Sequence, residues 1–469
     1  MIHLALLLAA AQTSPAQSPT YTPVVAAEAS PDGAWDGGMT VPAGLTIPFT
    51  LDLTGNGGRF AAPDQQVRDV PVTVATDARH VVVTLPGGGA TFDATLSADG
   101  AVLSGTWTRG TQSFPARFTR RGKAGVAAQQ SRPQTPLAPF PYEAREVTLA
   151  TTDRITLGGT LTRPSGPAIV PAILLIGGNG PQTRDETYAG HRPMLLVADR
   201  LTRAGFAVLR YDKRGVGTST GRYETASGAD LVGDAKAALT WLRVQPGVDA
   251  HRTCVLGLSE GAMIAPMVAV TEQPACVILL SPPGVPSAVL LGEQARLAAL
   301  DDGKSADVAR RDGAVTRAVV NAMARGEPKA RRMKLAVSAG ATDEQSGAIV
   351  RDLDTPEVRI FLVEDPAIAL RRLTMPVLVV VGANDQQVAP ALNLPPVRAA
   401  LARNVAAQIL VMPGLNHILQ PASTGAVRDY ATTDITMDER ALDAIVRFVG
   451  ETTGSVRPVH SKASRPSRR

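Results

Sequence analysis

The sequence predicts an α/β protein in which helices cover both faces of a parallel sheet, a helical cap is inserted into the sheet, and a small all-β domain precedes it. Three observations predict this architecture. Alternating apolar residues fill residues 33–121, continuous apolar strands alternate with helical patterns from about residue 143, and the strand signal disappears over about 284–372. Continuous apolar strands with helices between them are typical of parallel sheets buried on both faces.

Length and charge set the broad class. A chain of 469 residues exceeds one ordinary core, and 44% hydrophobic with 19% charged residues indicates globular domains. The net charge of +5 equals the charge of five basic residues in the tail, which holds no acid: Arg457, Lys462, Arg465, Arg468 and Arg469. Because the body is near neutral, we expect no nucleic-acid partner. We expect residues 453–469 to be a disordered basic tail.

The N-terminus resembles an export signal. Leu4–Ala11 is a short apolar run, and Ala9-Ala10-Ala11 offers a small-residue cleavage site, so we expect a signal peptide over residues 1–16. We therefore expect a periplasmic or secreted protein. No segment has the length of a transmembrane helix, so no membrane span is expected.

Residues 17–121 are expected to form the small all-β domain. Runs such as Val70, Val72 and Val74 alternate with polar residues, which is the pattern of strands with one buried face. Turn signals such as Asn56-Gly57-Gly58 separate these runs. Six or more short strands predict a barrel or a sandwich. The Pro- and Gln-rich residues 122–142 are expected to be an extended linker.

Residues 143–452 carry the α/β pattern. An opening hairpin is followed by five expected buried strands: Ile169–Ile176, Phe206–Tyr211, Thr253–Leu258, Ala275–Leu280 and Val377–Val381. The insertion over about 284–372 is too long for a plain connection. We interpret it as a helical cap over the carboxyl edge of the sheet, with a peripheral decoration as the alternative.

Two cysteines occur, Cys254 and Cys276, both in apolar strand-like runs. Free cysteines in such runs commonly behave as small core residues. We predict that both are free and buried, although an oxidising compartment would permit a bridge.

A candidate nucleophile lies in Gly257-Leu258-Ser259-Glu260-Gly261, which fits G-x-S-x-G between an apolar strand and an apolar helix. The glycines allow strand and helix to pack closely around a strained turn. A second match surrounds Ser219, but a polar turn precedes it and no apolar helix follows it. We therefore assign the nucleophile to Ser259.

A serine hydroxyl needs a base, and that base needs an acid to orient it. His417 follows the expected strand Gln408–Met412, and Asp385 follows Val377–Val381. Both therefore reach the same sheet edge as Ser259, in the chain order Ser, Asp, His that this kind of site uses. His191 is the rival base and Asp365 the rival acid.

An oxyanion formed at Ser259 needs two N–H donors. We assign them to the backbone of Glu260, directly after the nucleophile, and of Asn179 in the loop Gly177-Gly178-Asn179-Gly180-Pro181. A phosphate cradle is the weaker interpretation of this loop, because neither a following Lys-Ser/Thr nor G-x-G-x-x-G is present.

Residues of about 145–452 resemble the α/β-hydrolase superfamily, in the branch near the prolyl-oligopeptidase and dienelactone-hydrolase families, and most closely bacterial serine esterases with an N-terminal β domain. Four stretches carry the resemblance: Gly177-Gly178-Asn179-Gly180-Pro181-Gln182, Leu209-Arg210-Tyr211-Asp212-Lys213-Arg214-Gly215, Gly257-Leu258-Ser259-Glu260-Gly261 and Leu415-Asn416-His417-Ile418-Leu419-Gln420. The family often has His at Leu258 and Ser at Asn179, and neither position supplies a triad side chain. The resemblance implies that Asp212 and Arg214 brace loops. Residues 33–121 resemble the β domain fused to such esterases.

The sequence therefore predicts a carboxylic ester hydrolase that acts on short-chain or small-molecule esters through an acyl-enzyme. No metal or organic cofactor is implied. A serine peptidase of the prolyl-oligopeptidase type and a non-catalytic binding protein on the same fold are the alternatives. The oligomeric state is not predicted.

Overall fold

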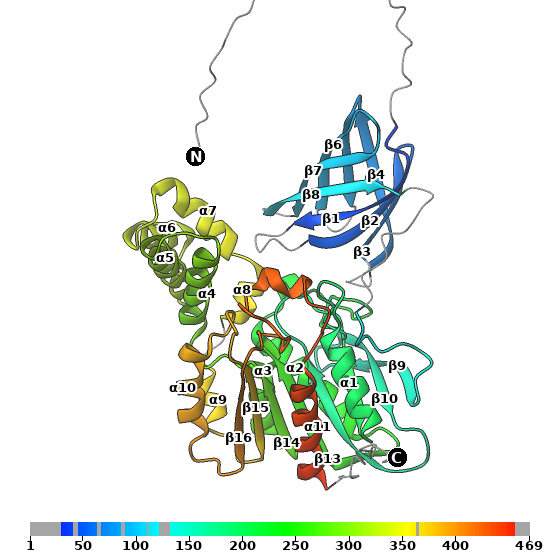
Figure 1. The fold of residues 1–469 in the computed structure, drawn as a ribbon, viewed down its shortest axis with the longest axis vertical. Helices are drawn as coiled ribbons and strands as arrows, with labels where there is room; N and C mark the ends of the chain where they lie inside the picture. The colour runs from blue at the N-terminus through cyan, green and yellow to red at the C-terminus, as the bar shows by residue number, and fades with distance from the viewer. Residues whose placement is uncertain are drawn as a thin grey trace, which may run out of the picture.

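The computed structural model describes residues 30–40, 46–62, 67–85, 90–109, 112–121, 132–362 and 365–454. The expected signal peptide, linker residues 122–131 and tail residues 455–469 lie outside this part of the chain. The described residues form a closed β-barrel and a helix-covered eight-stranded sheet with a helical insertion (Figure 1). The predicted fold class is therefore confirmed.

The N-terminal body is a barrel rather than a sandwich. Its strands are β1 (Gly33–Thr40), β2 (Thr46–Thr54), β3 (Gly57–Ala62), β4 (Val67–Asp77), β5 (His80–Leu85), β6 (Ala90–Leu96), β7 (Val102–Arg109) and β8 (Gln112–Arg120). Each strand pairs with the next, and β1 pairs antiparallel with β8, where Trp35 lies opposite Arg120. This last pairing closes the sheet and removes its edges.

Aromatic side chains fill the barrel. Trp35, Phe92 and Phe118 are fully buried, and the rings of Phe92 and Phe118 lie 4.9 Å apart. Phe49 and Trp107 pack at 4.8 Å. An eight-stranded barrel is just wide enough for side chains to fill. The interior of this barrel is thus a packed hydrophobic core.

The second body is built on a mixed sheet in the order β16-β15-β14-β13-β11-β12-β10-β9. Its strands are β9 (Glu143–Ala150), β10 (Thr156–Arg163), β11 (Val170–Ile176), β12 (Ala207–Tyr211), β13 (Val248–Leu258), β14 (Cys276–Leu280), β15 (Val377–Gly382) and β16 (Ala407–Met412). Strands β9 and β10 form the expected antiparallel hairpin. The other six strands run parallel to one another: β12, β11, β13, β14, β15 and β16.

Helices cover both faces of the sheet. They are α1 (Pro193–Arg203), α2 (Gly228–Arg243), α3 (Glu260–Glu272), α9 (Ala367–Leu370), α10 (Pro390–Leu401) and α11 (Glu439–Thr453), with the short turns η2 (Tyr223–Thr225) and η3 (Val427–Ala431). Successive strand residues face opposite cores. Val255 packs with α2, α3 and α10, whereas Leu256 packs with α1 and α11. The strands are continuously apolar because both faces of the sheet are buried away from water.

The chain changes direction across the sheet at β11. Strand β12 lies on one side of β11 and β13 on the other, so the carboxyl ends of β11 and β13 meet at a topological switch point. Open α/β sheets bind ligands at such points. The loop after β11 begins at Gly177, and Ser259 follows β13, so two of the predicted site segments start here.

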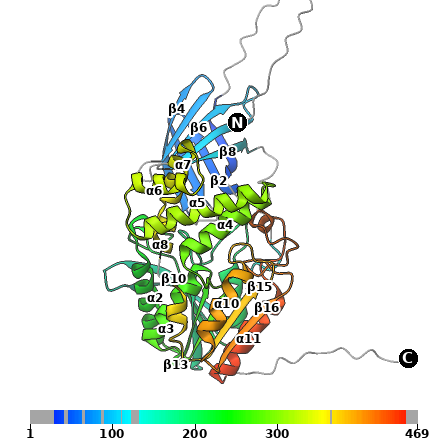
Figure 2. The same cartoon turned by 90° about the vertical axis from the view of Figure 1, so that its left-hand side faces the viewer.

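The insertion between β14 and β15 is helical. It contains α4 (Ser287–Asp301), α5 (Ala306–Ala324), α6 (Lys329–Ser338), α7 (Asp343–Leu353) and α8 (Pro356–Phe361). Leu290 of α4 and Phe361 of α8 pack with Met263 of α3 and with Val388. Because Met263 and Val388 are close in sequence to Ser259 and Asp385, the roots of the insertion lie against the carboxyl edge of the sheet. Figures 1 and 2 show the insertion and the barrel at this same end of the molecule.

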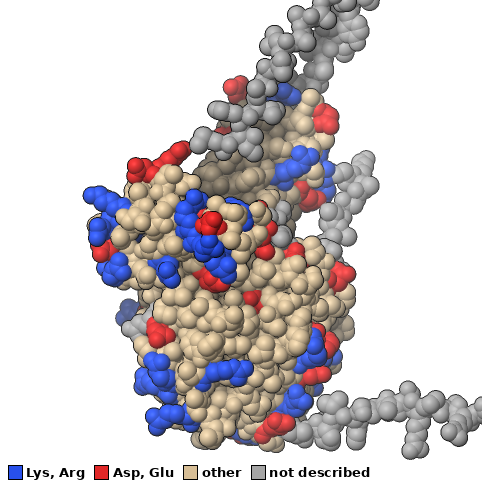
Figure 3. All heavy atoms as spheres, turned by 60° about the vertical axis from the view of Figure 1, so that its left-hand side comes forward, with Lys and Arg blue, Asp and Glu red and all other residues tan. Residues whose placement is uncertain are grey.

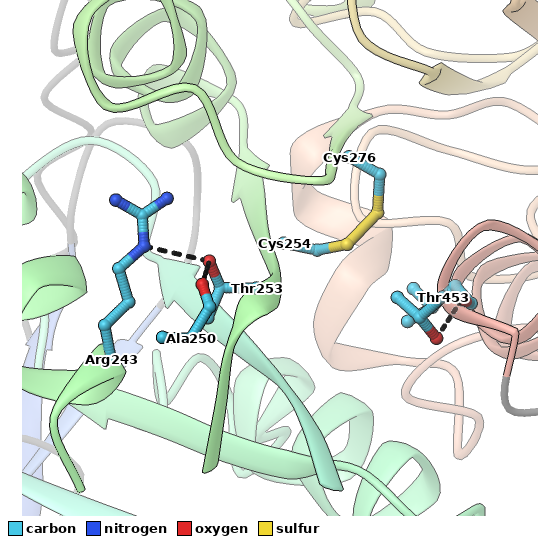
Figure 4. Close-up of a disulfide and its surroundings, with 7 residues drawn as sticks. Arg243, Ala250, Thr253, Cys254, Cys276 and Thr453 are labelled. Carbon is cyan, nitrogen blue, oxygen red and sulfur yellow. Dashed lines mark hydrogen bonds between the residues drawn. A yellow bond between two sulfur atoms is a disulfide. The ribbon is translucent and has the colours of Figure 1, made fainter.

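The prediction of free cysteines is wrong. Cys254 and Cys276 are buried as expected, but they form a disulfide with 4.7 Å between their Cα atoms (Figure 4). They lie directly opposite each other on the adjacent parallel strands β13 and β14. This register brings the two Cα atoms within disulfide range, and the linear sequence carries no information about register.

The described end of the linker is anchored. The guanidinium of Arg132 is buried and donates to the carbonyls of Ala189, Ala431 and Thr433. The side chain of Gln134 accepts from the N–H of Thr436. A Pro- and Gln-rich composition predicted only an extended spacer, because contacts of this kind depend on segments about 300 residues further along the chain.

Among the described residues, no helix combines the length and apolar character that crossing a membrane requires.

Candidate active site

Ser259 occupies a strained turn between β13 and α3. Its backbone has φ 55° and ψ −113°, a combination that a non-glycine residue adopts only when its surroundings enforce it. The flanking glycines explain how the turn fits. A Cβ on Gly257 would lie 2.0 Å from the carbonyl oxygen of Gly261, and a Cβ on Gly261 would lie 2.1 Å from that of Ile176. Ser259 is partly exposed at the edge of the sheet.

Asp385 and His417 form a buried pair at this edge. His417 Nδ1 lies 2.8 Å from Asp385 Oδ2, and the side chains of both residues are almost completely buried. Asp385 Oδ1 accepts from the backbone N–H groups of Gln387 and Val388, each at 2.8 Å. Since a carboxylate only accepts hydrogen bonds, Nδ1 of His417 carries the proton and Nε2 is the basic nitrogen. This is the tautomer that a general base requires.

Backbone contacts bring the His417 loop to the nucleophile. The Ser259 N–H donates to the carbonyl of Leu280 at 2.9 Å. The hydroxyl of Ser281, which follows Leu280 in the chain, donates to the carbonyl of His417 at 2.6 Å. The ends of β13, β14 and β16 are therefore tied together. Among the described residues, the Ser259 hydroxyl and the His417 ring share no hydrogen bond.

The loop after β11 lies beside the nucleophile. A Cβ on Gly178 would lie 3.6 Å from the carbonyl oxygen of Leu258. The N–H of Gly180 is engaged by the side chain of Asn179 at 2.8 Å, and the carbonyl of Asn179 accepts from Gln182. Glu260 is the first residue of α3, so no carbonyl of the helix accepts its N–H. Both expected oxyanion donors thus lie at the switch point.

A buried charged network surrounds this loop, and sequence reasoning gave the side chains of this network no role. Lys213 Nζ lies 2.7 Å from Glu260 Oε1 and also donates to the carbonyl of Gly178. Glu186 Oε2 accepts from the Gly178 N–H at 3.1 Å. Burial raises the pKa of Glu186 to about 7, against the opposing effects of the Gly178 N–H, Lys213 and His417. Burial likewise raises the pKa of Glu260, although Lys213 opposes the shift. Lys213 stands in one of the stretches that carried the family resemblance, which was the available signal.

The rival residues have other contacts. The Ser219 hydroxyl donates to the carbonyl of Asp212 at 2.7 Å and accepts from the Gly158 N–H at 2.9 Å, in a turn from which no helix starts directly. His191 is fully buried between Thr436 and the carbonyl of Tyr430. Burial lowers the pKa of His191 to about 4. Asp365 accepts from the N–H of Ala367. None of the three joins the Asp385–His417 pair.

Asp212 and Arg214 make bracing contacts. Asp212 Oδ2 lies 2.6 Å from Arg184 Nη2, and the pair is buried. Arg214 makes two bonds of 2.7 Å to the carboxylate of Asp234 in α2. These ion pairs hold the loop after β12, which carries Lys213.

In the described part of the chain, no group of three or more His, Cys, Asp or Glu side chains is arranged to hold a metal ion.

The chain is similar to several known proteins. Esterase EstD of Thermotoga maritima is 26% identical over 313 residues, which cover 66% of this chain and 68% of the esterase. An uncharacterized protein of Mycobacterium tuberculosis is 37% identical over 139 residues, covering 29% of this chain and 45% of that protein. Among solved structures, an esterase of Pyrococcus furiosus aligns at 19% identity with a TM-score of 0.42, covering 66% of this chain and 91% of that one.

A family model gives the assignment. Residues 153–415, more than half of the chain, match the model described as X-Pro dipeptidyl-peptidase (S15 family). These residues include the elbow at Ser259, the loop of Asn179 and Asp385, and the match ends two residues before His417. The fold, the elbow and this match together show that the protein belongs to the S15 family and is a hydrolase of the α/β-hydrolase fold.

Proposed function

We propose that the protein is a serine carboxylic ester hydrolase with Ser259 as nucleophile, His417 as base and Asp385 as orienting acid. The observation that carries the proposal is the buried Asp385–His417 pair beside a serine held at φ 55°. In the acylation step, His417 Nε2 takes the proton of the Ser259 hydroxyl as Oγ attacks the ester carbonyl. The hydrogen bond between Oγ and Nε2 is expected to form when substrate binds.

The tetrahedral intermediate carries its negative charge on the former carbonyl oxygen. The N–H groups of Asn179 and Glu260 are proposed to donate to this oxyanion. The imidazolium of His417 then gives its proton to the leaving alcohol, and the acyl group stays on Ser259. Water attacks the acyl-enzyme by the same route, which releases the carboxylic acid and restores the serine hydroxyl. The reaction balances without a metal or an organic cofactor.

A peptidase that releases X-Pro dipeptides from the N-terminus of peptides is the second candidate, because the matching family model is described by that activity. Such an enzyme needs an acidic group to bind the substrate's free ammonium. Of the two buried glutamates at the site, Glu186 accepts from the Gly178 N–H through Oε2, and Glu260 pairs with Lys213 through Oε1, while Glu260 Oε2 has no hydrogen-bond partner among the described residues. The charge of Lys213 opposes the binding of a second cation beside Glu260. These contacts favour the ester reaction. Assays with an X-Pro anilide that has a free amino terminus and with p-nitrophenyl butyrate, run in parallel, separate the two activities.

The nucleophile is tested by Ser259→Ala with Ser219→Ala as its matched control, since both serines stand in G-x-S-x-G. If the site behaves like other triads, Ser259→Ala is expected to lower kcat by about a million-fold. Ser219→Ala is expected to retain most activity, because it removes only turn hydrogen bonds worth about 1 kcal/mol each. Steady-state ester hydrolysis by folded variants measures both. An active Ser259→Ala protein would refute the mechanism.

We propose that the helical cap sets the size of the acyl group. Its roots at Leu290 and Phe361 pack next to the segments that carry Ser259 and Asp385. Figure 3 displays basic and acidic side chains interspersed over the cap, a distribution that favours neutral rather than charged substrates. A cap deletion from 287 to 361 is expected to change the preference across p-nitrophenyl esters of increasing chain length. An unchanged preference would contradict this role.

We also propose that the protein is exported and loses residues 1 to about 16. The signal-like sequence of the N-terminus supports export, and so does the Cys254–Cys276 disulfide, since disulfides persist in oxidising compartments. N-terminal sequencing of protein recovered from the periplasm or the medium tests the proposal, and an intact Met1 would refute it.

A further inference from the structure

Lys213 makes three directed contacts inside the protein. It lies in the loop after β12, and its side chain is 6% exposed. The ammonium group donates to the carbonyl of Gly178, lies 2.7 Å from Glu260 Oε1, and stands 5.8 Å from the centre of the Tyr223 ring. Its backbone N–H also donates to the carbonyl of Gln182, at the far end of the Asn179 loop. A buried lysine with contacts in these several directions is held in one place.

The carbonyl that Lys213 binds belongs to the peptide group whose N–H is that of Asn179. A peptide group is planar and trans, so its C=O and N–H point in opposite directions. Fixing the Gly178 oxygen on the side of Lys213 therefore directs the Asn179 N–H away from Lys213. The preceding peptide is fixed as well, because the Gly178 N–H donates to Glu186 at 3.1 Å.

The same ammonium binds the residue that supplies the other donor. Glu260 Oε1 is the acceptor for Lys213, and the Glu260 N–H is the donor directly after the nucleophile. The positive charge of the Lys213 ammonium beside the Gly178 oxygen also polarises that peptide group. It strengthens the Asn179 N–H as a donor, because hydrogen bonds in series reinforce each other. One side chain thus holds both halves of the oxyanion site in register.

We propose that Lys213 is a positioning residue that aims the Asn179 N–H at the oxyanion and fixes it relative to the Glu260 N–H. The inference rests on the proposed ester hydrolysis by Ser259. The competing explanation is that Lys213 only neutralises Glu260. Under that explanation, the bond to the Gly178 carbonyl is incidental to the reaction.

Two variants separate the explanations. Lys213→Met keeps the length of the side chain but removes the ammonium, and it leaves the Glu260 carboxylate buried without its partner, which is destabilising. The double variant Lys213→Met/Glu260→Gln removes both charges and keeps both backbone donors. Lys236→Met is the matched control, because Lys236 lies partly exposed on α2, outside the cap and the site.

The measurements are kcat, KM, the melting temperature and the inhibition constant of a trifluoromethyl ketone, which adds to the serine and forms an oxyanion. Losing one oxyanion donor lowers kcat by about 10²–10³-fold. We expect both Lys213 variants to lose about 100-fold in kcat and a similar factor in affinity for the ketone, with KM changed less than about threefold. Lys236→Met is expected to match the wild type.

Recovery of the double variant to within about threefold of the wild-type kcat would overturn the inference, because Lys213 would then be only a counter-ion. An unchanged affinity for the ketone in a folded Lys213 variant would overturn it too. If Lys213→Met does not fold, the double variant alone decides. Failure of the proposed function looks different, since the wild type would then show no ester hydrolysis that depends on Ser259.

Discussion

Replacing Asp385 by Asn is a sharp test of the triad, because the contacts of the carboxylate dictate how the amide must sit. Oδ1 accepts two backbone N–H groups, those of Gln387 and Val388, whereas Oδ2 accepts one N–H from His417. An asparagine has one oxygen and one NH₂ group. If the asparagine oxygen faces the backbone, it accepts both backbone N–H groups. If the side chain is turned the other way, the oxygen accepts one hydrogen bond, from His417, and the NH₂ group faces the two backbone N–H donors. The amide oxygen is therefore expected to face the backbone.

The NH₂ group of the substituted side chain would then face His417 Nδ1 and donate to it. The imidazole must carry its proton on Nε2, which removes the basic nitrogen from the Ser259 side. In a serine protease triad, the equivalent change lowers kcat by about 10⁴-fold, or about 5 kcal/mol of barrier. We expect a loss of this size, smaller than that of Ser259→Ala, with little change in melting temperature.

The assay is p-nitrophenyl butyrate hydrolysis by Asp385→Asn, with Asp365→Asn as the control. Asp365 was the rival acid, and within the described part of the chain its carboxylate accepts only from the N–H of Ala367, at 3.0 Å. The control is expected to retain wild-type kcat. If Asp385→Asn retained more than about a tenth of kcat, or if Asp365→Asn lost the activity instead, the assignment of Asp385 would be refuted.

Three further predictions concern stability. Reducing the Cys254–Cys276 disulfide, which spans 22 residues, is expected to lower the free energy of unfolding by about 3 kcal/mol on a chain-entropy basis, and equal urea midpoints for oxidised and reduced protein would contradict this. The pKa of His191 is about 4 in the folded protein against the ordinary value of 6.5, so between these values the unfolded chain binds a proton that the folded protein does not. About 3 kcal/mol of stability should therefore be lost as the pH falls from 6.5 to 4. Denaturant unfolding measured against pH should show a smaller loss for His191→Gln. The pKa of Glu186 is raised from 4.5 to about 7, so the folded protein loses stability relative to the unfolded chain as the pH rises from 4.5 to 7. Glu186→Gln should therefore be more stable than the wild type above pH 7, by up to about 3 kcal/mol, but no more stable at pH 4.5.

The parts that could be predicted from the sequence depend on local patterns. Period-2 alternation indicated an all-β domain, and continuous apolar runs indicated a buried parallel sheet. The elbow around Ser259 was readable because its glycines and its flanking strand and helix are contiguous. Strand β1 (Gly33–Thr40) was not distinguished, because GAWDGGMT has three glycines and little alternation. Closure of the barrel depends on β1 pairing with β8, about 80 residues later, and no local pattern reports such a pairing.

The parts that could not be predicted depend on register and on distant partners. Whether Cys254 and Cys276 bond is decided by which residues of β13 and β14 lie opposite each other. The buried end of the linker at Arg132 depends on carbonyls near residue 431. Lys213 looked like one charge among several in a polar turn. Its role emerges only because β12 and β13 flank β11 and bring Lys213, Gly178 and Glu260 together.

The proposed site positions its base and its oxyanion donors by two different physical means. The base is held by neutral backbone groups, since Asp385 is fixed by two N–H donors that cannot change charge. The oxyanion loop is held by a buried charged network, in which Glu186 titrates near neutral pH. Glu186 joins the two halves, because it binds the Gly178 N–H and interacts electrostatically with His417. In the proposed mechanism, its ionised form stabilises the imidazolium that His417 becomes in each tetrahedral step, and the same ionisation lowers the stability of the fold. A buried acid with this pKa therefore favours the protonated base of the proposed transition state while making the resting protein less stable, a combination that is common for charged groups at active sites.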